Sequence, residues 1–237
     1  MDKKIGIIGG MGPMASQLFY KMVTEMTEAE KDQEHLNLIM ISDASMPDRT
    51  SAILKKDYEE VAQKMEEDAL LLQHCGCCAI GVTCNTAHFF VDMIEEKLSI
   101  PFIHMIKETV SQISQIAPGG KIAVLATDGT VQTGIYQQRL AENGLIPYIP
   151  QPEIQKEVMH QIYDCIKKGK PYDANSWDKI QKAIQKEGCQ KAILGCTELS
   201  VIGAQQDLGE DYIDPMKILA KRVIEFSGKN IRQDRRA

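Results

Sequence analysis

The sequence has 237 residues, of which 43% are hydrophobic and 25% charged, as is typical of a globular protein with a sizeable apolar core. The formal net charge of −6 argues against nucleic acid as the main partner. We find no signal peptide and no apolar run long enough to span a membrane. With seven cysteines in a chain of this kind, we expect a reducing, cytoplasmic setting.

The first half of the chain alternates apolar runs with helical patterns. We expect strands at 4–9, 36–42, 78–80 and 101–105. We expect helices at about 14–30, 58–74, 89–94 and 108–116, and a loop at 43–51. Strands that alternate with helices predict a mainly parallel sheet with helices on both faces.

The pattern restarts after the turn-rich stretch 117–120. Strands are expected at 121–127, 144–148 and 192–195, a turn at 128–130, and helices at about 136–143, 153–168, 176–187 and 216–226. Ile5 and Ile122 open the first strand of each half, about 117 positions apart, and Cys84 and Cys196 are about 112 apart. These similar offsets predict two related α/β lobes.

We assign the lobes from these breaks. Residues 1–117 with 214–228 are expected to form an N-terminal lobe, because the last helix can return to pack on it. Residues 118–213 are expected to form a C-terminal lobe. The polar, basic tail 229–237 is expected to be disordered.

Two cysteines follow apolar strands and precede helices. Cys84 stands in Gly81–His88, and Cys196 follows Ala192–Gly195. The first amides of a helix lack internal partners and carry the positive end of its dipole, so a thiol there is shifted toward thiolate and a carboxylate can be held. Two such turns predict two thiols that face one cavity.

A dinucleotide site is the main alternative. Gly10, Gly12 and Ala15 match a relaxed phosphate-binding pattern, with Asp43 as the ribose-binding acid, and would make the protein an oxidoreductase. However, Pro13 removes an amide, and Asp43 lies beyond the usual spacing of about 20 residues. A tight turn that passes close to substrate explains the glycines equally.

Other polar and sulfur-containing residues leave several interpretations open. Cys75, Cys77 and Cys78, near His74 and His88, lack the second ligand pair of a structural zinc site and are expected to be buried, inert thiols. The same is expected of Cys165 and Cys189. His88 could orient Cys84 or simply pack. Arg49 follows a strand end, where it could bind a carboxylate or be solvated.

Six motifs together resemble those of a known family. They are Gly9–Pro13, Met46–Thr50, Thr83–His88, Thr127–Thr130, Gly195–Glu198 and Asp214–Pro215. In this order they resemble the cofactor-independent aspartate/glutamate racemase family, specifically its aspartate racemase branch, over the whole chain except the tail. The resemblance implies two pseudo-symmetric α/β lobes with the active site in the cleft between them.

The resemblance also implies roles for individual residues. Cys84 and Cys196 fall on the catalytic cysteines, and Arg49 on the arginine that grips the distal carboxylate. The other implied substrate-binding residues are Met11, Thr50, Ser51, Asn85, Thr86, Lys167, Thr197 and Glu198. Residues expected to adjust the site are Thr83, His88, Thr127 and Thr130. Gly9-Gly10 and Glu198 replace the Asp-Ser pair and the His of cell-wall glutamate racemases, which argues against that role.

The implied reaction is racemisation of aspartate and/or glutamate by two thiols, one removing the α-proton and the other returning one on the opposite face. Neither cofactor nor metal is expected. The expected partner is a small amino-acid substrate. We expect binding to neither nucleic acid nor a membrane, and a homodimer is one possible assembly. Broader or neutral specificity, a hydantoin racemase, a maleate isomerase and a non-catalytic amino-acid sensor stay open as alternatives.

Overall fold

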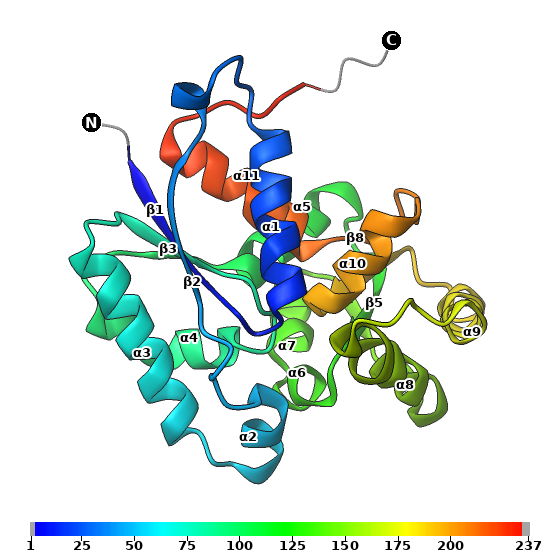
Figure 1. Cartoon of the computed structure of the whole chain (residues 1–237). Coiled ribbons are helices and arrows are strands. Elements are labelled where there is room, and N and C mark those ends of the chain that lie inside the picture. The colour runs from blue at the N-terminus through cyan, green and yellow to red at the C-terminus, as the bar shows by residue number, and fades with distance from the viewer. Residues whose placement is uncertain (1–2, 234–237) are drawn as a thin grey trace.

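The structure is a computed structural model, and it describes residues 3–233. Two four-stranded sheets lie side by side (Figure 1), and every strand pair in them is parallel. The first holds β1 (Lys4–Gly9), β2 (Asn37–Ser42), β3 (Ala79–Val82) and β4 (Phe102–Ile103), in the order β2-β1-β3-β4. The second holds β5 (Lys121–Ala126), β6 (Ile146–Tyr148), β7 (Lys191–Gly195) and β8 (Tyr212–Ile213), in the order β6-β5-β7-β8. The orders are equivalent, so the predicted two-lobed α/β fold is confirmed.

Helices cover both sheets. Those from the first half are α1 (Pro13–Met26), α2 (Arg49–Lys55), α3 (Glu59–His74), α4 (His88–Ile94) and α5 (Met105–Ile116). Those from the second half are α6 (Asp128–Thr133), α7 (Ile135–Glu142), α8 (Pro152–Met159), α9 (Ala174–Lys186), α10 (Thr197–Gln205) and α11 (Pro215–Ser227). Figure 1 shows α3 at one end of the molecule and α9 at the other. Within residues 3–233, no helix combines the length and the apolar character that crossing a bilayer would require.

The central strands are buried because both faces carry helices. In β1 every residue after Lys4 is buried, and all four residues of β3 are buried. Such continuous apolar runs, without alternation, are typical of parallel strands covered on both sides. The carboxyl ends of these strands are therefore held firmly, and the loops that leave them can position side chains.

The last helix packs on elements made from the start of the chain. Pro215 at the first helical position and Asp214 at the N-cap, whose Oδ1 accepts from the Met216 amide at 2.9 Å, set where α11 begins. One core cluster joins β1, α1 and α11, and includes Ile5, Phe19, Met216, Leu219 and Val223. Figure 1 shows α1 and α11 next to each other.

The structure differs from the sequence prediction at short elements. The expected loop 43–51 ends in the first turn of α2, the expected turn 128–130 is the start of α6, and α1 ends at Met26, not near 30. The expected continuous helix 153–168 is α8 followed by a π-helical segment, His160–Cys165, and a 3₁₀ turn, Ile166–Lys168. Cys165, with φ −102° and ψ −83°, leaves the helical region where the two meet.

Part of the tail has a defined position. The Glu28 amide donates to Asn230 O at 2.9 Å, the Arg232 amide donates to Met26 O at 2.7 Å, and Ile231 pairs with Thr27. Disorder was expected from residue 229 onward, but these backbone bonds and the packing of Ile231 on the core of the first sheet hold this segment. Residues 234–237 lie outside the described residues.

Candidate active site

Cys84 and Cys196 follow equivalent strands of the two sheets, β3 and β7, and each is only 7% exposed. Their turns meet: Thr197 Oγ1 donates to Thr83 O at 3.4 Å. Thr83 is itself buried, with its Oγ1 3.2 Å from Ser16 Oγ in α1. The fold therefore brings the two cysteine turns together where the lobes join.

The two turns are not alike in detail. Cys196 is the N-cap of α10, whereas α4 begins only at His88, after a turn at residues 85–87. The helix-end argument for a thiolate therefore applies to Cys196, where two other effects oppose it. Burial raises the pKa of Cys196 well above its ordinary value, and the charge of Glu198 raises it further, against the opposing charge of Lys167.

Cys196 has a carboxylate partner. Its Sγ donates to Glu198 Oε2 at 2.8 Å, and Lys167 Nζ donates to Glu198 Oε1, also at 2.8 Å. Glu198 is 3% exposed. Burial alone would lower the pKa of Lys167, but the charge of Glu198 and its hydrogen bond to Lys167 hold that pKa above its ordinary value. The structure thus joins Cys196, Glu198 and Lys167 in one chain of contacts.

Gly12 in the β1–α1 loop makes room for this group. A Cβ at Gly12 would collide with Glu198 Oε1, because it would lie closer to that oxygen than any packed atom can approach. At Gly10 the backbone itself requires glycine. Its φ is +87°, and a Cβ there would lie 2.5 Å from the backbone of Asp43. Both glycines are explained by close approach within this fold.

Arg49 is buried at the start of α2, with 8% exposed. Its NH1 group donates to Pro47 O at 2.8 Å and Met46 O at 3.2 Å, and NH2 donates to Met11 O at 3.0 Å. Burial opposes the charge, but nearby Cys84 and Asp48 hold the pKa of Arg49 above its ordinary value. A solvated arginine is thereby excluded, and its Nε has no hydrogen-bond partner within residues 3–233.

His88 is buried behind the Cys84 turn. Its Nε2 accepts from the Met105 amide at 3.2 Å, so its Nδ1 carries the hydrogen that is donated to Cys84 O at 2.8 Å. Burial lowers the pKa of His88 to about 3, and nearby His104 adds to the effect. The ring is neutral near pH 7, so it orients the Cys84 backbone and carries no charge to the thiol.

Hydroxyl and amide groups from both lobes complete the site. Thr86 Oγ1 lies 3.1 Å from Thr127 Oγ1 and 2.8 Å from Thr130 Oγ1, which are 3.1 Å from each other. Tyr136 donates its hydroxyl to Asn85 Oδ1 at 2.6 Å, while Asn85 Nδ2 has no partner in the part of the chain that is described. The backbone of Thr50 lies against Gly129, and the Ser51 amide donates to Asp48 Oδ1 at 2.7 Å.

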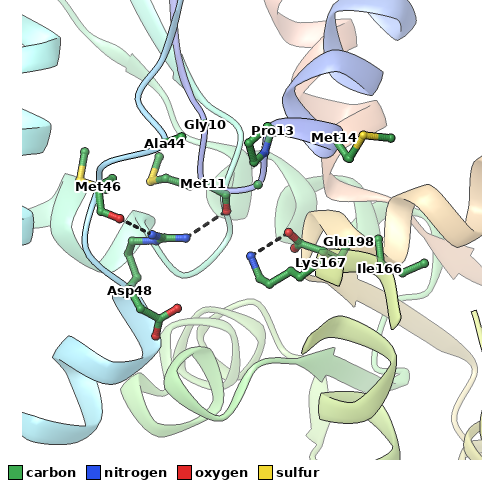
Figure 2. A pocket seen from close by; sticks show the side chains of 12 residues that line it. Gly10, Met11, Pro13, Met14, Ala44, Met46, Asp48, Ile166, Lys167 and Glu198 are labelled. Atoms are coloured by element: carbon green, nitrogen blue, oxygen red, sulfur yellow. Dashed lines mark hydrogen bonds and ion pairs between the residues drawn. The ribbon is translucent and has the colours of Figure 1, made fainter. Parts of the chain in front are cut away.

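A cavity of about 280 Å³ lies between the lobes beside these groups (Figure 2). Figure 2 shows Lys167 and Glu198 on one side of it and Met46 and Asp48 on the other, with Met11 between. The residues that line it are Gly10, Met11, Gly12, Pro13, Met14, Ala44, Met46, Asp48, Arg49, Ile166, Lys167 and Glu198. Cys84 and Cys196 are not among them. Small ligands with a charged group could enter here.

Tyr136 and Tyr163 are site residues that sequence reasoning missed. Tyr163 lies on the π-helical segment, four residues before Lys167, and donates to Asp48 Oδ2 of the other lobe at 3.1 Å. Its ring lies 5.6 Å from Lys167 Nζ. The spacing of four from Lys167 was a signal for Tyr163. Tyr136, on α7, carried no such signal.

The remaining cysteines lie apart from this site. Cys77 and Cys165 are buried as expected, but Cys75 is exposed, and Cys78 and Cys189 are half-buried. The expectation of burial was wrong for Cys75 because it follows the last turn of α3 at the surface. Within residues 3–233, no three His, Cys, Asp or Glu side chains come together in a way that could hold a metal ion.

Three comparisons show what the chain resembles. The family described as Asp/Glu/hydantoin racemase matches residues 8–223. The broad specificity amino-acid racemase RacX of Bacillus subtilis is 27% identical over 227 residues, which are 93% of this chain and 96% of RacX. The aspartate racemase structure of Picrophilus torridus has a TM-score of 0.83 at 30% identity, covering 97% of this chain and 96% of that one. An aspartate racemase homologue from Pyrococcus horikoshii OT3 has a TM-score of 0.77 at 26% identity, covering 95% and 99%.

Proposed function

We propose that this chain, which belongs to the Asp/Glu/hydantoin racemase family and is thus an isomerase, racemises aspartate and/or glutamate with Cys84 and Cys196 as its two bases. No cofactor is part of the proposal. The observation that carries it is the pair of buried cysteines at the ends of equivalent strands, β3 and β7, whose turns are joined by Thr197 and Thr83.

The thiols would share the proton transfer. One thiolate removes the α-proton from one face of the substrate, and the opposite thiol gives a proton to the other face. A single base would have to cross the substrate to do both. The carbanion formed between the two steps needs hydrogen-bond donors where its charge develops. Asn85 Nδ2, which is buried and has no partner within residues 3–233, is one such donor beside Cys84.

The preference for an acidic side chain rests on two cations at the cavity. Arg49 and Lys167 both line it, one from each lobe. Arg49 keeps its Nε–H free of any partner among the described residues, although its other nitrogens bind backbone carbonyls. A side-chain carboxylate could accept from this nitrogen and draw Lys167 from Glu198. Every amino acid has the α-carboxylate, so only such added cations favour acidic substrates.

A second candidate is a racemase of broader specificity. Met11, Met14 and Met46 line the cavity, and methionine side chains adapt to ligands of different shape. The relative RacX is named as a broad specificity amino-acid racemase. In that case Arg49 mainly holds the loops that carry Met11 and Met46, through the bonds to their carbonyls.

Proton NMR in D₂O with a panel of L-amino acids and no added cofactor tests both candidates. Exchange of the α-proton of aspartate or glutamate alone supports the first, and exchange across neutral amino acids supports the second. Binding without exchange would instead indicate a sensor.

The two-base mechanism is tested by Cys84→Ala and Cys196→Ala. Each variant should lose racemisation to the detection limit while its unfolding curve stays close to that of the unchanged protein. Serine variants should fare little better, because a hydroxyl is a far poorer base. Cys189→Ala is the control, since Cys189 is half-buried and outside the site, and it should keep full activity. Full activity of either site variant would contradict the mechanism.

A further inference from the structure

The two thiols lie in opposite electrostatic surroundings. Arg49, a fixed cation, donates to the carbonyls of Met11 and Met46, and both of these residues belong to the same core cluster as Cys84. Cys196 instead lies against an anion, with its Sγ 2.8 Å from Glu198 Oε2. A cation attracts a thiolate and a carboxylate repels one. The charges around the two cysteines therefore favour a thiolate at Cys84 and a protonated thiol at Cys196 before any substrate binds.

The charged groups that act most on Cys196 come from both lobes. Glu198 comes from α10, Lys167 from the 3₁₀ turn after the π-helical segment, and Cys84 from the opposite lobe. Two phenols also face it. Burial raises the pKa of Tyr163 to about 12 and that of Tyr136 well above its ordinary value, so both stay neutral near pH 7. Among the described residues, Glu198 is the one carboxylate that accepts a hydrogen bond from the thiol.

Glu198 is held in this position from several sides. It is 3% exposed, and Lys167 fixes its other oxygen at 2.8 Å. The absence of a side chain at Gly12 leaves the space that Oε1 occupies. A charge this buried normally has its hydrogen bonds satisfied, and here the Cys196 thiol and the Lys167 ammonium supply them. The thiol proton is thus part of what makes the buried carboxylate tolerable.

From this geometry we infer that Glu198 is a positioning residue that holds the proton of Cys196, so that the resting enzyme has Cys196 as its acid and Cys84 as its base. The inference rests on the proposed two-thiol reaction. In the first turnover the Cys84 thiolate takes the α-proton, and the Sγ–H of Cys196 passes to the carbanion. Cys196 is then a thiolate next to Glu198, which favours its reprotonation from solvent.

Glu198→Gln tests the inference, because the amide keeps the shape of the side chain but not its charge. Iodoacetamide labelling followed by peptide mass spectrometry reads each cysteine separately. Near pH 7, Cys196 should be alkylated at least about fivefold faster in the variant, because the like charge that disfavours its thiolate is gone. Exposed Cys75 is an internal reference and should not change.

The pH dependence of kcat/KM, measured from each enantiomer, gives a second readout. In the direction where Cys196 is the base, activity rises with pH as that thiol ionises. In the direction where it is the acid, activity falls over the same range. Glu198→Gln should shift both the rise and the fall of kcat/KM to lower pH. If Glu198 had only a structural role, the substitution would lower both activities without shifting either part of the pH profile.

Two further variants keep the test decisive. Gly12→Ala should push Glu198 aside and move the Cys196 labelling in the same direction, even if Glu198→Gln does not fold. Glu157→Gln, which removes a carboxylate that binds Lys179 at 2.6 Å at the surface, should change nothing. Unchanged labelling of Cys196 in both Glu198→Gln and Gly12→Ala would overturn the inference. Activity retained in Cys84→Ala would overturn the proposed function instead, and the labelling result would stand apart from it.

Discussion

Arg49 shows how one buried residue can serve two purposes. Its guanidinium binds the carbonyls of Met11, Met46 and Pro47, and so ties the loops after β1 and β2 together. The same group lines the cavity and lies beside Cys84. Substitution therefore affects both stability and substrate binding, and an experiment has to separate them.

We predict that Arg49→Leu lowers kcat/KM for aspartate and glutamate by at least ~30-fold, because removing one partner of a buried charged hydrogen bond costs about 2–5 kcal/mol. Unfolding in denaturant should also show a loss of about 1–3 kcal/mol from the unpaired carbonyls. Arg49→Lys should recover only part of the catalytic loss, since an ammonium cannot make a bidentate pair. Equal losses for acidic and neutral amino acids would show that Arg49 holds the loops and does not select the side chain.

His88 gives the protein a specific sensitivity to acid. Burial lowers its pKa in the folded state from 6.5 to about 3, so the unfolded chain binds more protons between these values. Its contribution to stability is therefore complete above about pH 6.5 and is lost as the pH falls toward about 3. Burial also lowers the pKa of His104, whose ring centroid lies 4.7 Å from that of His88, so it acts in the same direction.

His88→Gln isolates the first of these contributions. Between about pH 7 and about pH 5, the free energy of unfolding of the unchanged protein should fall by about 2 kcal/mol more than that of the variant. Urea unfolding at the two pH values measures this difference. The variant should be less stable at pH 7, because the bond to Cys84 O is weakened. Parallel losses in the two proteins would show that His88 already carries a proton in the folded state.

At the scale of elements, long buried strands were predictable and short elements were not. β1, β3, β5 and β7 are apolar runs between turns, and their positions could be read from the sequence. β8 has two residues and α2 has seven, which is too little for a periodic pattern. Asp48 before α2 and Thr127 before α6 were usable signals, because both side chains cap these helices.

The π-helical segment explains an error of a different kind. The apolar spacing of 153–168 fits one helix, and nothing in it marks an added residue. In the structure the segment from His160 to Cys165 rotates the next residues about the helix axis, and the 3₁₀ turn then directs Lys167 to Glu198. Long-range contacts set this geometry, so the pairing of Lys167, Glu198 and Cys196 was beyond sequence reasoning. The π-helical segment directly precedes two residues that line the cavity, Ile166 and Lys167, and such segments tend to occur at functional sites.

At the scale of the whole molecule, the lobes are joined by polar contacts around the cleft and by α5 and α11. Asp92 on α4 accepts from Arg139 on α7 at 2.8 Å. Burial alone would raise the pKa of Asp92, but the hydrogen bond from His104 and the nearby cations lower it to about 2. Asp92 is therefore ionised near pH 7, and its ion pair with Arg139 persists. Ile106 of α5 and Ile218 of α11 belong to the core beneath β5, while other residues of α11 belong to the core beneath β1.

This sharing predicts that a chain ending at residue 213 does not fold. It would lose Met216, Leu219, Ala220, Val223 and Ile224 from the core of the first sheet. At about 1.5–3 kcal/mol for each large side chain, the loss is comparable to the whole stability of a typical domain. Circular dichroism should show no cooperative melting, and a hydrophobic dye should bind. A chain ending at residue 233 is the control and should melt like the full chain, whereas a cooperative transition in the shorter chain would contradict the prediction.

The return of α11 also bears on how the protein is made. Domains usually fold as units during synthesis, from the N-terminus onward. Here β1 emerges first, yet the helix that covers it comes after all eight strands. The cluster that packs α8 and α9 against the second sheet consists of residues within 123–212, all of which are synthesised before α11. On the ribosome, the first sheet must therefore wait with one apolar face open, so the part of the chain that is made first is the last to be finished.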